Sequence, residues 1–206
     1  MTRVGLDQIT VITRAAQLVN QMGMEQVTLK MLAESLGVKS PSLYNHIEGL
    51  DDLKKQLMLY GWSQAEEQIL HSVIGLSGYD AVKAMCFAFY DYALKNPGVF
   101  DVMLWYNKFQ DDETEQATSG LLTVIFKITK SLNIPDTYCF HLIRTFRGFL
   151  EGFFLLVNHG SFGHSLPMAD SFGLSVSILI EGIRALTPEW QAGETEKPQM
   201  GGESFV

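Results

Sequence analysis

The stretch from Val27 to Ile47, VTLKMLAESLGVKSPSLYNHI, constrains the fold most, because its pattern predicts two short helices joined by a tight turn. Thr28 is placed to cap the first helix by offering its hydroxyl to backbone N–H groups that have no intrahelical partner. The apolar residues of this helix recur at helical spacing: Leu29, Leu32, Ala33 and Leu36. Gly37 follows directly and can adopt the positive φ that ends a helix. The pattern therefore predicts a helix-turn-helix.

The second helix of this unit is expected to expose most of its side chains. We expect it to begin with Ser40 as its N-cap and Pro41 at its first position, where a missing N–H costs nothing. Only Leu43 and Ile47 are placed to enter a core, whereas the others point outward: Lys39, Ser40, Ser42, Tyr44, Asn45 and His46. Its N-terminus suits phosphate, and its small polar side chains can reach base edges in a major groove. The alternative is a helical hairpin with an ordinary solvated face.

These residues resemble the N-terminal DNA-binding domain of the TetR family of bacterial transcriptional regulators. The family's pattern T-x-x-x-(L/I)-A-x-x-x-G-V-x-x-x-x-(I/L)-Y-x-H-(F/I) is matched here by Thr28, Leu32, Ala33, Gly37, Val38, Leu43, Tyr44, His46 and Ile47. The preceding helix also fits, since Gly23 ends it and its apolar face is formed by Ile9, Ile12, Ala15, Ala16 and Val19. The acidic start of the following helix, Asp51-Asp52-Leu53, fits as well. The sequence match covers roughly the first 60 residues, and beyond them only the architecture is similar.

One position departs from the family pattern. The resemblance implies a phosphate-contacting lysine four residues after the motif histidine, but this chain has Leu50 there, preceded by Gly49. Lys54 or Lys55, one turn further along, is a candidate replacement, and either could equally lie on a solvated face. The predicted DNA-binding residues are Thr28, Lys39, Ser40, Pro41, Ser42, Tyr44, Asn45, His46 and Lys54.

Composition and charge indicate the class of protein and the compartment in which it works. The chain has 206 residues, 47% hydrophobic and 18% charged, which is typical of a globular protein. The formal net charge of -8 opposes DNA binding, but residues 1–60 hold six basic and six acidic side chains, so the acidic excess lies in the rest of the chain. No long uncharged apolar run and no signal sequence is found, so we expect a cytoplasmic protein without membrane contact. Cys86 and Cys139 lie in apolar patterns, which predicts buried, reduced thiols rather than a redox switch.

The remainder of the chain predicts an all-α fold. Hydrophobic residues at helical spacing run from Leu50 to Ile74, Tyr79 to Leu94, Val99 to Phe109, Leu121 to Leu132, Tyr138 to Val157 and Phe172 to Leu186. Glycine, proline and the acidic run Asp111 to Glu115 separate them. We therefore expect roughly nine helices in total: a three-helix helix-turn-helix domain over 1–49, followed by a larger helical effector-binding and dimerisation domain over 50–188. The polar, glycine-rich segment 189–206 is expected to be disordered.

The two last predicted helices, Tyr138–Val157 and Phe172–Leu186, carry apolar residues on more than one face. Gly148 and Gly152, spaced four apart, allow another helix to come close. A partner subunit is a natural cover, which predicts a homodimer through these two helices; a fully internal helix pair is the alternative. The resemblance implies the same dimer, which would place two recognition helices on successive turns of a palindromic operator.

Large aromatic and methionine side chains are concentrated between Met85 and Phe109. Such walls suit an apolar ligand, although each of these residues also suits an ordinary core. The resemblance implies a sensor pocket for a small apolar or aromatic effector in this domain. The candidate effector-binding residues are Met85, Phe89, Met103, Trp105, Tyr106, Phe109, Phe146 and Phe153.

The sequence favours a regulator over an enzyme. It has no glycine-rich phosphate loop, no GxSxG and no HExxH, and its histidines lack metal-ligand spacing, so we expect no catalysis, no metal and no cofactor. The interpretation is a ligand-responsive transcriptional regulator, most simply a repressor released from double-stranded operator DNA by its effector. One alternative is a DNA-binding adaptor whose helical domain binds a protein partner. A second is a helical enzyme or carrier with an incidental N-terminal module.

Overall fold

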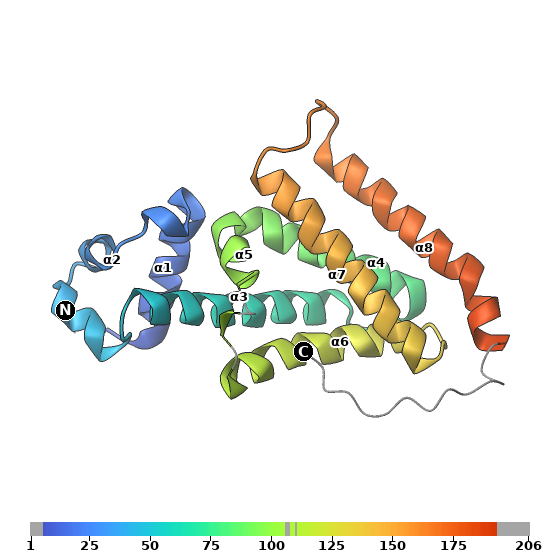
Figure 1. The fold of residues 1–206 in the computed structure, drawn as a ribbon, viewed down its shortest axis with the longest axis horizontal. Coiled ribbons are helices and arrows are strands. Elements are labelled where there is room, and N and C mark those ends of the chain that lie inside the picture. The colour runs from blue at the N-terminus through green and yellow to red at the C-terminus, as the bar shows by residue number, and fades with distance from the viewer. Residues whose placement is uncertain (1–5, 106–107, 110, 193–206) are drawn as a thin grey trace.

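The computed structural model describes residues 6–105, 108–109 and 111–192, and every regular element in this part of the chain is a helix (Figure 1). The α-helices are α1 (Gln8–Met22), α2 (Leu29–Ser35), α3 (Leu50–Ser72), α4 (Gly78–Lys95), α5 (Pro97–Met103), α6 (Asp112–Lys130), α7 (Asp136–Asn158) and α8 (Met168–Ala192). Two 3-10 helices lie between the first of these, η1 (Met24–Gln26) and η2 (Ser40–Asn45). The predicted all-α fold is confirmed.

The N-terminal module is built as the sequence predicts. Thr28 Oγ1 accepts a hydrogen bond of 3.2 Å from the backbone N–H of Met31, which confirms it as the cap of α2. Gly37 has a φ of 67°, the left-handed conformation that the turn after α2 requires. Leu32 of α2 and Leu43 of η2 are fully buried, so the two halves of the helix-turn-helix share one core.

The predicted second helix is present with 3-10 geometry, and two other local predictions for this module are wrong. The second helix is a 3-10 helix, held by backbone bonds three residues apart such as His46 N to Leu43 O at 2.8 Å. Lys39 rather than Ser40 stands at its N-cap, without a side-chain hydrogen bond. Ile9 is 59% exposed, because the buried stripe of α1 includes Val11 and Leu18 and is thereby rotated away from Ile9.

The helical domain is arranged around α3, which runs from the N-terminal module along the length of the molecule (Figure 1). Helices α4, α5 and α6 pack directly on α3, α7 packs across α4 and α6, and α8 packs against α4. The approach of α3 to α5 is very close: a Cβ built on Gly61 would lie 2.5 Å from Met103 Cγ. Any side chain at position 61 would therefore require the side chains of Met103 and Val99, or α5 itself, to shift.

Other boundaries differ from the predicted ones for local reasons. The acidic run expected to break the chain forms the start of α6, because Asp111 caps that helix by accepting from Thr114 N at 2.9 Å. Helix α5 ends at Met103, well before Phe109.

Helix α8 continues past Pro188 to Ala192, so the first four residues of the segment expected to be disordered are helical. A proline within a helix removes one backbone hydrogen bond and crowds the carbonyl four residues before it, yet α8 continues for four residues beyond Pro188. Residues 193–206 lie outside the described residues. In the part of the chain that the structure describes, no helix has the length and apolar character needed to span a membrane.

Candidate DNA-binding and effector-binding surfaces

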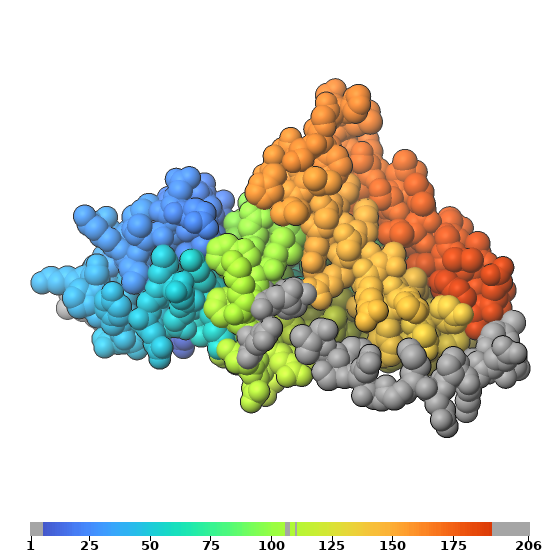
Figure 2. All heavy atoms as spheres, viewed as in Figure 1, coloured from blue at the N-terminus to red at the C-terminus, as the bar shows by residue number. Residues whose placement is uncertain are grey.

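The segment Lys39–His46, which contains η2, forms the exposed polar surface of the N-terminal module, at the blue end of the molecule in Figure 2. Leu43 is fully buried and Ile47 is 2% exposed, which confirms them as the anchors of this segment. Lys39, Pro41, Tyr44 and Asn45 are exposed, whereas Ser40, Ser42 and His46 are half-buried. Tyr44 is unusual in exposing 59% of its surface. A large aromatic residue that remains in solvent is available for a partner.

Lys54, which the sequence offered as a phosphate contact, is turned toward the helical domain. Its Nζ lies 3.5 Å from Asp51 Oδ1 and 5.5 Å from the centre of the Trp105 ring, and its side chain is 25% exposed. The structure therefore does not bring Lys54 to the η2 surface.

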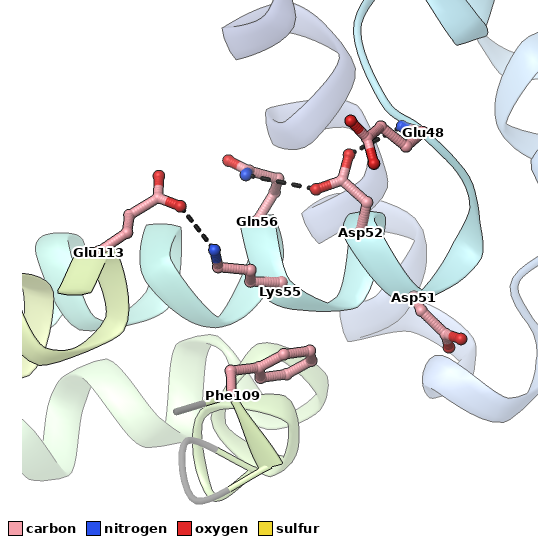
Figure 3. Close-up of a pocket in the computed structure, with 7 residues that line it drawn as sticks. All are labelled: Glu48, Asp51, Asp52, Lys55, Gln56, Phe109 and Glu113. Carbon is pink, nitrogen blue, oxygen red and sulfur yellow. Dashed lines mark hydrogen bonds and ion pairs between the residues drawn. The ribbon is translucent and has the colours of Figure 1, made fainter. Parts of the chain in front are cut away.

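Lys55 connects α3 to the start of α6. Its Nζ lies 2.8 Å from Asp111 Oδ2. It also lies 2.7 Å from Glu113 Oε2, the contact drawn in Figure 3. The hydrogen bond from Lys55 lowers the pKa of the Asp111 carboxyl to about 2, and the same bond raises the pKa of the Lys55 ammonium group. Both lysines after Leu50 thus have partners within the chain.

A pocket of about 470 Å³ lies beside this ion pair, between the start of α3 and the start of α6 (Figure 3). Its lining is mostly acidic and polar: Glu48, Asp51, Asp52, Lys55, Gln56, Phe109 and Glu113. Asp52 accepts a hydrogen bond of 2.8 Å from Glu48 N, so one of these carboxylates stabilises the chain before α3. This pocket could not be predicted from the sequence, because it depends on residues of α6 that lie far along the chain from α3. Of the predicted effector-binding residues, Phe109 contributes to its wall.

The other predicted effector-binding residues that the structure describes pack among themselves or against neighbouring helices. Met85 and Met103 are each 1% exposed and Phe146 is 2% exposed. Phe89 and Phe153 belong to one cluster of rings, with Phe89 5.9 Å from Phe100 and Phe153 5.2 Å from Phe172 between ring centres.

Trp105 is half-buried, with Lys108 Nζ 4.1 Å from the centre of its ring. Tyr106 lies outside the described residues. An apolar effector site at these positions stays a prediction.

The surface of α7 and α8 is apolar and open. Phe154 and Phe172 are fully buried in the chain's own core, but Leu174 and Ile178 of α8 are each 63% exposed. A Cβ built on Gly148 or Gly152 of α7, or on Gly182 of α8, would meet no atom within 4 Å. These two helices therefore present an apolar surface with small residues and no cover from the described part of the chain.

The two cysteines are buried and not joined by a disulfide, as predicted. Burial raises the pKa of the Cys86 thiol to about 12, which makes it unreactive at neutral pH. Within the described residues, no group of three or more His, Cys, Asp or Glu side chains is placed to hold a metal ion.

Comparison with known proteins agrees with this architecture. The model of the tetracyclin repressor-like C-terminal domain matches residues 82–179, the part of the chain for which the sequence motifs carry no family information. The family model and the curated relatives support a regulator of the TetR family. The chain is 28% identical over 182 residues to YobS, an HTH-type transcriptional regulator of Bacillus subtilis, and the match covers 88% of this chain and 94% of YobS. An HTH-type regulator of Mycobacterium tuberculosis is 28% identical over 152 residues, which covers 73% of this chain and 70% of the relative.

Solved structures share the fold of this chain at low sequence identity. A protein of unknown function from Rhodococcus sp. RHA1 superimposes with a TM-score of 0.76 at 14% identity, over 88% of this chain and 97% of the other. TetR from Acinetobacter baumannii AYE gives a TM-score of 0.70 at 17% identity, over 89% and 99% of the two chains. The family model and the curated HTH-type relatives, together with the exposed helix-turn-helix surface, support a DNA-binding transcriptional regulator, and the solved structures add the shared fold.

Proposed function

We propose that this chain is a ligand-responsive repressor of the TetR family. As a homodimer it binds a palindromic operator, and a small apolar or aromatic effector in the helical domain releases it. Residues 1–49 form the DNA-binding domain and residues 50–188 form the effector-binding and dimerisation domain. A cytoplasmic location follows from this function, because that is where bacterial DNA lies.

The observation that carries the proposal is the exposed polar segment Lys39–His46 on a module whose core is closed by Leu32 and Leu43. Phosphate contacts supply much of the affinity of a DNA-binding module, and residues 1–60 carry as many acidic as basic side chains. A single module therefore binds weakly. Two modules on one duplex overcome this weakness, since the second contact becomes intramolecular.

The dimer forms through α7 and α8. Leu174 and Ile178 expose most of their apolar surface, and Gly148 and Gly152 leave room for a close helix from a second copy. Two-fold pairing of this surface gives a four-helix contact and places two η2 segments on one side of the dimer, about 34 Å apart for adjacent major grooves.

Release by an effector uses α3. This helix begins at Leu50, next to the DNA-binding surface, and α4, α5 and α6 pack against it. An effector that favours a different packing of these helices moves the start of α3 and changes the spacing of the two modules. It releases DNA only to the extent that it binds the released form more tightly. A TetR variant of Acinetobacter baumannii with the same fold was crystallised with minocycline, which supports an effector with fused rings.

The test is an electrophoretic mobility shift with the purified full chain and the intergenic DNA on either side of its own coding sequence. We expect a retarded band that disappears on adding a compound from a panel of apolar drugs that includes minocycline. A band that resists every compound, but is changed by a protein from the same cell, would favour the adaptor. No retardation of any duplex, including duplexes enriched by in vitro selection, would refute DNA binding itself.

A further inference from the structure

The first turn of α5, Asn96–Asp101, contacts two helices that belong to different functional parts of the chain. In the sequence, Asn96-Pro97-Gly98 indicates only a break between helices. In the structure α5 lies between α1 of the DNA-binding module and the C-terminal end of α7 (Figure 1). The contacts on the two sides are made by separate side chains.

On the first side, α1 rests on the backbone of this turn. Asn20 Oδ1 accepts a hydrogen bond of 2.9 Å from Val99 N, and Asn20 Nδ2 donates one of 3.1 Å to Asn96 Oδ1. A Cβ built on Gly98 would lie 2.1 Å from the carbonyl oxygen of Val19, so only glycine permits this approach. These contacts fix the packing distance between α1 of the DNA-binding module and α5.

On the second side, Asn158 holds the end of α7 on the same turn. Its Nδ2 donates to the carbonyl oxygen of Pro97 at 3.3 Å and to Asp101 Oδ1 at 3.2 Å. Asn158 is the last residue of α7 and is half-buried, so water competes with these bonds only in part. Asn20 and Asn158 are 138 residues apart in sequence. Both nevertheless form hydrogen bonds with the same segment, Asn96–Asp101, from opposite sides.

We propose that the turn Asn96–Asp101 is a coupling element that fixes the DNA-binding module relative to the dimerisation helices, with Asn20 and Asn158 as its positioning residues. The inference rests on the proposed function, because α7 sets the dimer axis only if the chain pairs through α7 and α8. A displacement of the end of α7 is transmitted through α5 to α1, and a displacement of α1 by DNA is transmitted back with the same coupling free energy. The turn thereby sets the distance between the two η2 segments.

The test measures the distance between the two DNA-binding modules in the full-length dimer without DNA or effector. A spin label is placed on Lys30→Cys, since the Lys30 side chain is 80% exposed, whereas the native cysteines Cys86 and Cys139 are both buried. Pulsed electron-spin measurements then give the distribution of distances between the labels of the two protomers. We expect a narrow distribution for the otherwise unchanged chain.

Asn158→Asp keeps the size of the side chain but turns a donor into a carboxylate that faces the Asp101 carboxylate. We expect a broadened distance distribution and about five- to tenfold weaker binding to a duplex obtained by in vitro selection. The double variant Asp101→Asn with Asn158→Asp restores one hydrogen bond of reversed direction and should narrow the distribution again. His159→Ala, at the exposed neighbouring position, is the matched control and should leave it unchanged.

Asn20→Ala removes the hydrogen bonds between α1 and the segment Asn96–Asp101, and it should broaden the same distance distribution. This variant tests the proposal independently if Asn158→Asp does not fold. A dimer whose distribution is equally narrow in both Asn158→Asp and Asn20→Ala would overturn the coupling element while leaving the proposed function intact. A monomer, with no distance between labels, would overturn the proposed dimer and the coupling element with it.

Discussion

Lys55 Nζ lies 2.8 Å from Asp111 Oδ2, so a lysine that follows the helix-turn-helix is bound to the N-cap carboxylate of α6 rather than presented to DNA. Lys54, its neighbour, lies over the Trp105 ring. Leu50 occupies the position where the resemblance implies a phosphate-binding lysine, and both following lysines have partners within the chain. Helix α3 therefore uses its cations to hold the helical domain.

This assignment predicts the salt dependence of DNA binding. Each phosphate contact adds about one unit to the slope of log affinity against log salt concentration. We expect Lys54→Met and Lys55→Met to leave that slope unchanged. The matched control, Lys83→Met on the exposed surface of α4, should leave it unchanged as well. Fluorescence anisotropy titrations at several salt concentrations measure it. A slope smaller by about one for either variant would assign that lysine to a phosphate.

The same pair predicts a pH effect. The pKa of Asp111 is lowered from 3.8 to about 2, first by the hydrogen bond from Lys55. Because the carboxylate is favoured in the folded chain, the pair stabilises the fold fully above pH 3.8 and loses this contribution as the pH falls from 3.8 toward 2. Carbon NMR titration of the Asp111 carboxyl should give a pKa near 2, and Lys55→Met should raise it toward 3.8. An equal pKa in both proteins would mean that the pair does not form in solution.

The η2 surface predicts two classes of variant. Tyr44→Ala and His46→Ala should weaken binding to all DNA sequences alike, because the resemblance implies that these residues contact phosphates. Ser42→Ala and Lys39→Ala should instead change the preferred base at one position, because a side chain that reads a base edge contributes about 1–3 kcal/mol of discrimination there. Selection from a randomised duplex pool, repeated for each variant, measures both effects. The division would be wrong if all four variants lost affinity equally at every base.

The exposed faces of α7 and α8 predict how the dimer can be broken. Leu174 and Ile178 are each 63% exposed, and the double variant Leu174→Glu with Ile178→Glu should yield a monomer in analytical ultracentrifugation. Loss of the second module should weaken operator binding by two orders of magnitude or more, on the order of the avidity of linked sites. Ile74→Glu is the control, because Ile74 is 74% exposed but lies between α3 and α4. That variant should remain a dimer, and dimeric behaviour of both proteins would place the interface elsewhere.

Local signals in the sequence predict the N-terminal module well. Thr28 and Gly37 act within a few residues of their own positions, so their chemistry fixes the ends of α2 without help from the rest of the chain. Ser40 is expected to behave in the same way, but the tight turn favours 3-10 geometry and moves the cap to Lys39. The acidic run after residue 110 is ambiguous in sequence, because acidic residues mark both loops and helix starts.

Contacts between distant segments could not be predicted in this way. Whether Lys55 faces DNA or α6 depends on the path of the chain near Asp111, and helical periodicity carries no information about that path. Likewise, Asn20 and Asn158 are ordinary polar residues in sequence, and only the fold brings both to α5. The surroundings of the predicted effector-binding residues could not be predicted either, since an aromatic run is equally consistent with a packed core and with a pocket.

Hydroxyl-radical footprinting of the full chain on a selected duplex tests the central claim most directly. A dimer that presents two η2 segments should protect two patches on one face of the duplex, about 10 base pairs apart from centre to centre. Tyr44→Ala should weaken both patches together. A single protected patch, or two patches on opposite faces of the duplex, would contradict the proposed arrangement of the dimer on DNA.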